Sequence, residues 1–125
     1  MAKTNFVDEF IANAKESTDG IHAVTVVEIE SGMTLGNFSD GSIDPEVASA
    51  YNVEVVKSKL KAVSALGLSD SIDDILITLT TQYHLISCTE NGTHMIYLAA
   101  DKKKSNLAML RSIVSKGKRE IQEKL

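Results

Sequence analysis

The segment from Pro45 to Leu66 constrains the fold most, because its pattern predicts one helix with two apolar sides. An α-helix turns by roughly 100° per residue, which places the apolar residues of this segment in two stripes. The first stripe consists of Ala48, Tyr51, Val55, Ala62 and Leu66. The second stripe consists of Val53, Val56, Leu60 and Val63. The core of a small domain normally covers one stripe of a helix. We therefore expect the second stripe, Val53 to Val63, to be covered by something other than the protein's own sheet.

The length and charge of the chain predict one globular domain that spans residues 1–125. A chain of 125 residues can bury one sizeable core without metals or disulfides. Its formal net charge of -4 offers no general attraction for phosphate backbones, so we expect no nucleic-acid partner. The one basic run, Lys102 to Lys104, is interpreted as a solvated loop.

The use of cysteine and the distribution of apolar residues indicate where the protein works. Cys88 is the only cysteine, which excludes an internal disulfide and the paired-thiol zinc motifs and favours a reducing compartment. The N-terminus has no apolar run of the signal-peptide type, and the chain has no stretch of about 18 apolar residues. We expect a cytoplasmic protein that does not insert into a membrane.

Turn and cap signals divide the chain into helix, two strands, helix, three strands and helix. The first helix is expected to begin at Thr4 or Asn5, and Asp44 with Pro45 is expected to cap the middle helix. The expected strands are Ile21 to Glu30, Met33 to Phe38, Ile72 to Thr80, Tyr83 to Thr89 and Thr93 to Ala100. Ser105 is expected to cap the last helix. This order predicts an α+β three-layer sandwich with a five-stranded, mostly antiparallel sheet, the middle helix on one face and the terminal helices on the other.

Three short segments show a resemblance to a known family. They are Asp19 to Val24 at the first strand, Glu30 to Met33 at the first hairpin, and Asn106 to Arg111 at the last helix. With the order of elements, they resemble the Roadblock family, whose profilin-like domains include dynein light chains and bacterial and archaeal regulators of Ras-like GTPases. The resemblance extends from about Phe6 to Ser115. Longin domains are the structural rival, but they usually begin with a strand, whereas this chain begins with a helix.

The resemblance implies a dimer in which the third strands pair and the middle helices meet. The strand from Ile75 to Thr80 carries no inward charge, proline or glycine, so it is a poorly protected edge in a monomer. A two-fold axis places each such patch against its own copy. The expected partner is a second copy or another Roadblock protein. The predicted interface consists of Val53, Val56, Leu60, Val63, Ile75, Ile77 and Leu79.

The sequence offers little evidence for catalysis, and we expect no catalytic residue, cofactor or metal. It contains no phosphate-binding glycine loop, dinucleotide motif, zinc-protease motif or serine nucleophile motif. Cys88 and His94 are predicted to point to opposite faces of their hairpin. His84 lies roughly 13 Å from Cys88 along a strand at ~3.3 Å per residue, too far for a nucleophile and its base. The loop with Asp70, Asp73 and Asp74 lacks the ligand pattern of an EF-hand.

These observations lead to a hypothesis of a non-enzymatic interaction module. The resemblance implies a dimeric platform that regulates or scaffolds a Ras-like small GTPase. Lys57, Lys59 and Lys61 of the middle helix are the candidates for polar contacts with that partner. Two alternatives remain: a structural light chain that docks a peptide or helix of a larger assembly, and a small-molecule sensor or enzyme.

Overall fold

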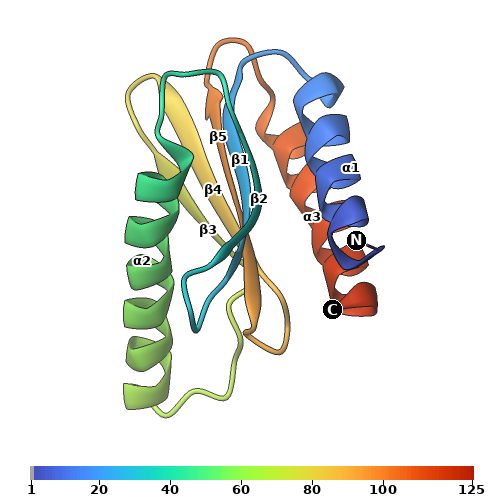
Figure 1. Ribbon diagram of the computed structural model, residues 1–125. Coiled ribbons are helices and arrows are strands. Elements are labelled where there is room, and N and C mark those ends of the chain that lie inside the picture. The colour runs from blue at the N-terminus through green and yellow to red at the C-terminus, as the bar shows by residue number, and fades with distance from the viewer. Residues whose placement is uncertain (1) are drawn as a thin grey trace.

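The elements expected from the sequence are present in the expected order and form three layers (Figure 1). The computed structural model describes the backbone of residues 2–125 and the side chains from Phe6 onward. The described elements are α1 (Ala2–Ser17), β1 (Ile21–Glu28), β2 (Thr34–Ser39), α2 (Pro45–Ala65), β3 (Asp74–Thr78), β4 (Gln82–Cys88), β5 (His94–Asp101) and α3 (Leu107–Lys124). The protein therefore has the α+β sandwich architecture that its sequence predicts.

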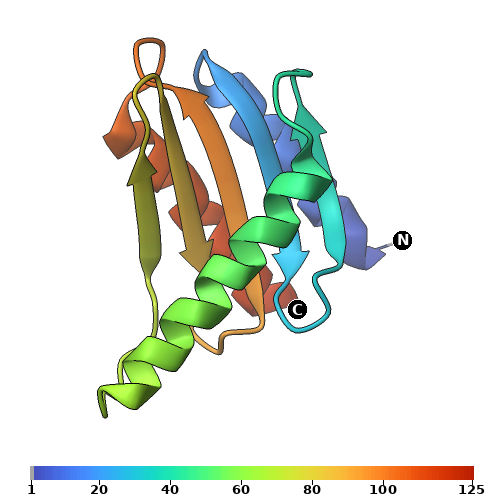
Figure 2. The ribbon, with the colours of Figure 1, turned by 90° about the vertical axis from the view of Figure 1, so that its left-hand side faces the viewer.

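The five strands form one antiparallel sheet in the order β2-β1-β5-β4-β3. The central pair, β1 and β5, aligns Val26 with Ile96 and Val24 with Leu98, and both strands are almost completely buried. Within the described residues, β3 pairs with β4 alone. Its other side is a free edge of the sheet (Figure 2).

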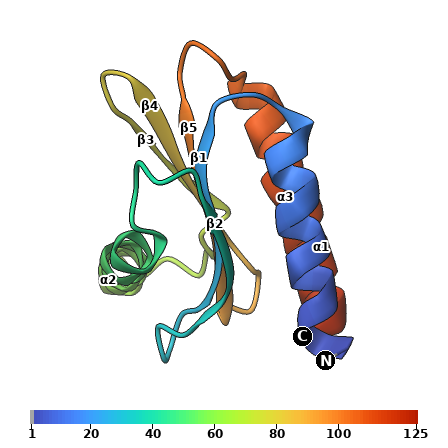
Figure 3. The ribbon, with the colours of Figure 1, turned by 45° about the horizontal axis from the view of Figure 1, so that its top comes forward.

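Helices cover the two faces of the sheet unequally (Figure 3). On one face, α1 and α3 pack against a core that includes Val24 and Val26. On the other face, α2 packs against a smaller core that includes Val27 and Ile29. Val24, Val26 and Val27 of β1 and Ile29 just after it thus divide between the two faces. Successive side chains of a strand point to opposite faces of the sheet.

The helices of the two-helix layer approach closely at Gly117. A Cβ atom at this position would lie 2.5 Å from the ring of Phe10, closer than two carbon atoms tolerate. Gly117 is buried in α3, so this glycine allows α1 and α3 to pack side by side over the sheet.

Local hydrogen bonds explain where α2 begins and ends. The Asp44 carboxylate accepts hydrogen bonds from the backbone N–H groups of Glu46 and Val47, and Pro45 occupies the first turn. Gly67 follows the helix with a φ of 72°, a conformation that glycine adopts without steric cost. The predictions for both ends of this helix are confirmed.

Several predicted boundaries are wrong, and β1 ends at Glu28 before the expected Glu30. Helix α1 begins at Ala2, before the expected Thr4 or Asn5, because alanine and lysine favour helix. Asn106 caps α3 by accepting from the N–H of Met109, whereas Ser105 donates to the carbonyl of Asp101. Strand β3 is shorter than expected.

The end of β3 has a simple cause. The N–H of Leu79 donates to the carbonyl of Gln82 across the turn to β4, so Leu79 lies beyond the strand. The strand retains Ile75 and Ile77 within its bounds.

Candidate interaction surface on α2 and β3

One side of α2 is sealed against the sheet of its own subunit. Val53 is 4% exposed and Val56 is fully buried, and Leu60 packs against the same core cluster. Val63 is half-buried. The prediction that this stripe awaits another molecule is therefore wrong: Val53 and Val56 belong to the core of the subunit.

Two polar residues lie beside this stripe on the side of α2 that faces the sheet. The hydroxyl of Ser49 donates to the hydroxyl of Thr25 on β1 at 3.0 Å, in the interior. Asn52 is also buried on this side. Buried polar groups need hydrogen-bond partners, and Thr25 supplies one that allows Ser49 to face the sheet. The apolar period alone could not distinguish the two stripes.

The other apolar stripe of α2 faces outward. The side chains of Tyr51 and Leu66 are 73% and 71% exposed, and Val55 is 38% exposed. Val47 extends this stripe toward the start of the helix and is also exposed. The helix thus has a second apolar side without cover in the subunit, but it is the side that the sequence analysis assigned to the core.

A groove separates this outer side of α2 from the edge strand β3. Helix α2 crosses the sheet diagonally and packs mainly against β1 and β2, which leaves the β3 side of the face open (Figure 2). The groove has a volume of about 600 Å³. It is lined by Tyr51, Glu54, Val55, Ser58, Lys59, Ala62 and Ile75. An apolar groove therefore lies between α2 and Ile75 of the edge strand.

The predicted interface residues of the edge strand lie on the face of the sheet that carries α2. Ile75 pairs with Ile86, and Ile77 pairs with His84, so both isoleucines share the face that carries α2. Both are half-buried, and Leu79 is 43% exposed just after the strand. An interface role for Ile75, Ile77 and Leu79 stays a prediction.

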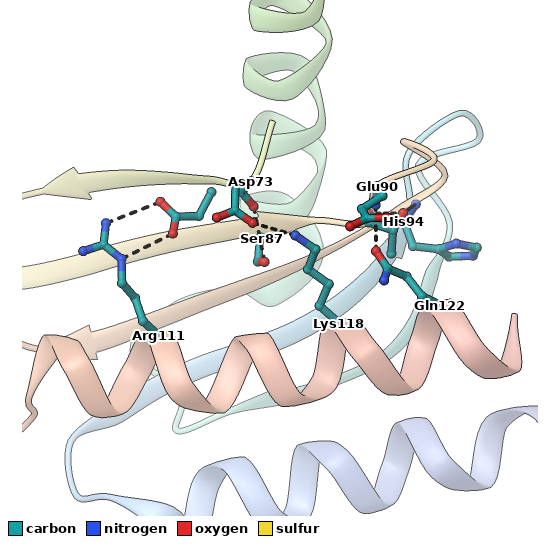
Figure 4. A network of polar contacts seen from close by, with 9 residues as sticks. Asp73, Ser87, Glu90, His94, Arg111, Lys118 and Gln122 are labelled. Carbon is teal, nitrogen blue, oxygen red and sulfur yellow. Dashed lines mark hydrogen bonds and ion pairs between the residues drawn. The ribbon is translucent and has the colours of Figure 1, made fainter. Parts of the chain in front are cut away.

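Ion pairs with α3 hold the start of β3 from the opposite face (Figure 4). The ammonium group of Lys118 lies 2.7 Å from the carboxylate of Asp73, and this contact lowers the pKa of Asp73. The guanidinium of Arg111 contacts Asp74 at 3.3 Å. These aspartates, considered in the sequence as a loose cation loop, pair with α3. No group of three or more metal-ligating side chains occurs in the described part of the chain.

The three candidate lysines of α2 do not share one surface. Lys57 donates to the backbone carbonyl of Glu30, near the β1–β2 turn, at 3.4 Å. Lys59 lines the groove beside β3, and Lys61 is exposed. A single partner contact by all three residues is therefore not supported by their placement, and a partner role for each stays a prediction.

The buried thiol and the histidines do not form a catalytic pair. Cys88 is 3% exposed, and burial raises its pKa to about 11. The ring of His84 hydrogen-bonds to Gln82 at 2.7 Å and to the hydroxyl of Tyr97 at 3.3 Å. The ring of His94 contacts Thr93. A thiol with a pKa this high stays protonated near neutral pH and is a poor nucleophile.

The contact between His22 and Asp40 was not predicted from the sequence. His22 lies 2.8 Å from the carboxylate of Asp40. Hydrogen bonds from Ser42 and then His22 lower the pKa of Asp40 to about 2. The pairing of β1 with β2 aligns Ala23 with Ser39 and so brings the two partners together. The register of this hairpin was the only signal that could have revealed the contact.

Comparison with solved structures identifies the fold. No family profile and no curated protein matches the chain, but solved structures match it along almost its whole length. The chain has the Roadblock-type fold.

Three of the similar structures come from different bacteria. The Roadblock/LC7 domain from Streptomyces avermitilis is 11% identical with a TM-score of 0.79, and the match covers 93% of this chain and 94% of that one. The gliding protein MglB from Thermus thermophilus is 8% identical with a TM-score of 0.80, covering 98% and 90%. MglB of Myxococcus xanthus is 14% identical with a TM-score of 0.77, covering 98% and 86%.

A final observation concerns membranes. None of the helices within residues 2–125 is long and apolar enough to cross a bilayer.

Proposed function

We propose that this protein is a non-catalytic, dimeric module that regulates or scaffolds a Ras-like small GTPase. The observation that carries the proposal is the apolar groove between α2 and β3, together with the position of β3 at the end of the sheet. A surface of this kind on a small domain is typical of a protein–protein contact. The resemblance to the Roadblock family implies a regulatory role, and the likeness to the solved MglB structures supports the fold on which that role depends.

A second subunit covers both exposed features at once. Pairing of two β3 strands about a two-fold axis satisfies their free backbone groups and continues the sheet from one subunit into the other. The same axis brings the outer side of each α2, with Tyr51 and Val55, toward the partner. The interface that we propose consists of Tyr51, Val55 and Ala62 of α2 with Ile75, Ile77 and Leu79 in and just after β3.

The paired α2 helices then form a platform on one face of the sheet. Helix α2 contains no arginine, so it offers no arginine finger of the kind that stabilises charge during GTP hydrolysis. The module instead acts by holding the switch regions of the GTPase in one of their arrangements, which shifts its nucleotide cycle. Of the three candidate lysines, we propose Lys61, which is exposed on α2, as the residue that contacts the GTPase.

Binding to purified small GTPases tests this proposal. Each small GTPase encoded near the gene is loaded with GDP or with a non-hydrolysable GTP analogue, and its binding is measured by interferometry. We expect one GTPase to bind in one nucleotide state, and Lys61→Glu to weaken that binding. Lys116→Glu, on α3 in the opposite layer, is the matched control and leaves it unchanged.

Two results would contradict the proposal. The regulatory role is refuted if none of the GTPases binds, or if the affinity is the same in the GDP-bound and GTP-analogue-bound states. Equal effects of the two lysine substitutions would place the contact elsewhere.

A further inference from the structure

A second cavity shares no lining residue with the groove between α2 and β3. Its volume is about 320 Å³, which is at the lower end of the range for small-molecule sites. The α2–β3 loop and the turn between β4 and β5 contribute to its walls, and both lie at the end of the sheet where α2 ends (Figure 1). None of its residues belongs to the dimer interface that we propose, so a ligand in this cavity does not depend on that dimer.

The inner part of this cavity is apolar. It is lined by side chains that belong to the core cluster under α2 or pack against it: Ile29, Val56, Leu60, Ile72 and Cys88. Burial raises the pKa of the Cys88 thiol to about 11, so the sulfur carries no charge near neutral pH. An apolar cavity of about 150 Å³ is large enough for benzene, so this larger cavity accommodates one aromatic ring with a short side chain.

Two carboxylates determine the charge at the mouth of the cavity. Asp70 and Glu90 line it from two different loops, and both are exposed. Neither forms an ion pair among the residues that the structure describes. No lysine, arginine or histidine is found among the described lining residues, and the ammonium group of Lys118 on α3 is already paired with Asp73. The mouth therefore attracts a cationic group and repels an anionic one.

We propose that this cavity binds a small organic cation in which a short chain joins one aromatic ring to an ammonium group. The ring fills the apolar interior, and its removal from water supplies most of the affinity. The ammonium group lies at the mouth, where Asp70 and Glu90 accept its hydrogen bonds. A neutral ligand of the same shape gains only the apolar contribution, and a carboxylate ligand is repelled.

Titration with probes of nearly equal size tests this assignment. The probes are phenethylamine, phenethyl alcohol and phenylacetate, which are cationic, neutral and anionic at neutral pH, and NMR spectra of the isoleucine methyl groups of the full chain report binding. We expect phenethylamine to shift the resonances of Ile29 and Ile72 and to leave Ile75, in the groove, unchanged. Two exposed ion pairs contribute about 2- to 5-fold each, so the amine is expected to bind about 4- to 25-fold more tightly than the alcohol. Phenylacetate is expected to bind more weakly than the alcohol.

Substitutions at the mouth separate the contribution of charge from that of the apolar interior. Asp70→Asn and Glu90→Gln are each expected to weaken phenethylamine binding about 2- to 5-fold and to leave phenethyl alcohol binding unchanged. Glu54→Gln, which removes an exposed carboxylate from the groove, is the charge-matched control and binds both probes like wild type. Ile72→Trp fills the cavity and is expected to abolish binding of both probes, with circular dichroism to show that the variant is folded.

Three results would overturn the proposal. If phenethylamine does not shift the resonances of Ile29 and Ile72, the cavity is not its site. If the amine and the alcohol bind equally, or if phenylacetate binds more tightly than either, the preference for a cation is refuted. If Glu54→Gln weakens amine binding as much as Glu90→Gln does, the cation does not lie at the mouth of this cavity. The proposed dimer stands in each case, because sedimentation tests it separately.

Discussion

Two adjacent valines of α2 give the most direct test of which side faces the core. Val56 is fully buried against the sheet, whereas Val55 is 38% exposed in the groove. Val56→Ala removes two buried methyl groups, which costs about 1.6 kcal/mol at about 0.8 kcal/mol per buried carbon. The remaining cavity raises the expected loss of unfolding free energy to about 2–3 kcal/mol. Val55→Ala is expected to cost about 0.5 kcal/mol or less within the subunit.

The comparison is well matched because both changes are chemically identical. The higher helix propensity of alanine favours both variants by the same amount, up to about 0.7 kcal/mol, so the difference between them reflects packing. Urea unfolding with an unchanged m-value gives the two free energies. Unfolding at two protein concentrations separates the stability that dimerisation adds, because that part depends on concentration. We expect Val55→Ala to reduce this part and Val56→Ala to leave it unchanged. If the two variants lose the same unfolding free energy at each concentration, or if Val55→Ala loses more than Val56→Ala, the assignment of the two sides is refuted.

Three further predictions concern the core and its titrating groups. Gly117→Ala places a methyl group against the Phe10 ring and is expected to lower the unfolding free energy by about 1–3 kcal/mol; an unchanged urea midpoint would contradict the close packing of α1 and α3. Burial raises the pKa of Cys88 to about 11, so its alkylation by iodoacetamide at pH 8 is expected to be far slower in the folded protein than in urea; equal rates would show an accessible thiol. Burial lowers the pKa of His84 below its ordinary 6.5, so the unfolded state takes up the proton first and stability falls as the pH drops below about 6.5. His84→Gln is expected to flatten this fall in urea midpoints between pH 7 and pH 5, and a fall of the same size in the variant would exclude His84 as a cause.

The layers and strands could be predicted because local signals agree with the tertiary structure. Asp44 and Pro45 signal a helix start through backbone geometry alone, and Asn91 and Gly92 mark the β4–β5 hairpin in the same way. The alternation of apolar residues in β1 indicated a strand covered on both faces. These features depend on neighbours in the sequence, and the structure contains all of them.

The orientation of α2 could not be predicted from its apolar pattern. Both stripes carry residues of similar hydrophobicity, and the buried side also carries the contact between Ser49 and Thr25. That contact joins residues from different elements, so no periodicity reveals it. The groove was missed for the same reason, because it arises from the diagonal path of α2 relative to Ile75. The free edge of β3 was expected from the resemblance to the Roadblock family, and a strand without inward charge, proline or glycine agrees with an edge that a partner covers.

The oligomeric state of a single variant tests the central claim most directly. Val55→Asp places a charge in the exposed groove without disturbing the buried side of α2. Sedimentation equilibrium is expected to show a dimer for wild type and a folded monomer for Val55→Asp, with the circular dichroism spectrum unchanged. A wild-type protein that sediments as a monomer at all concentrations, or a variant that remains as dimeric as wild type, would contradict the claim that α2 and β3 join two copies of this chain.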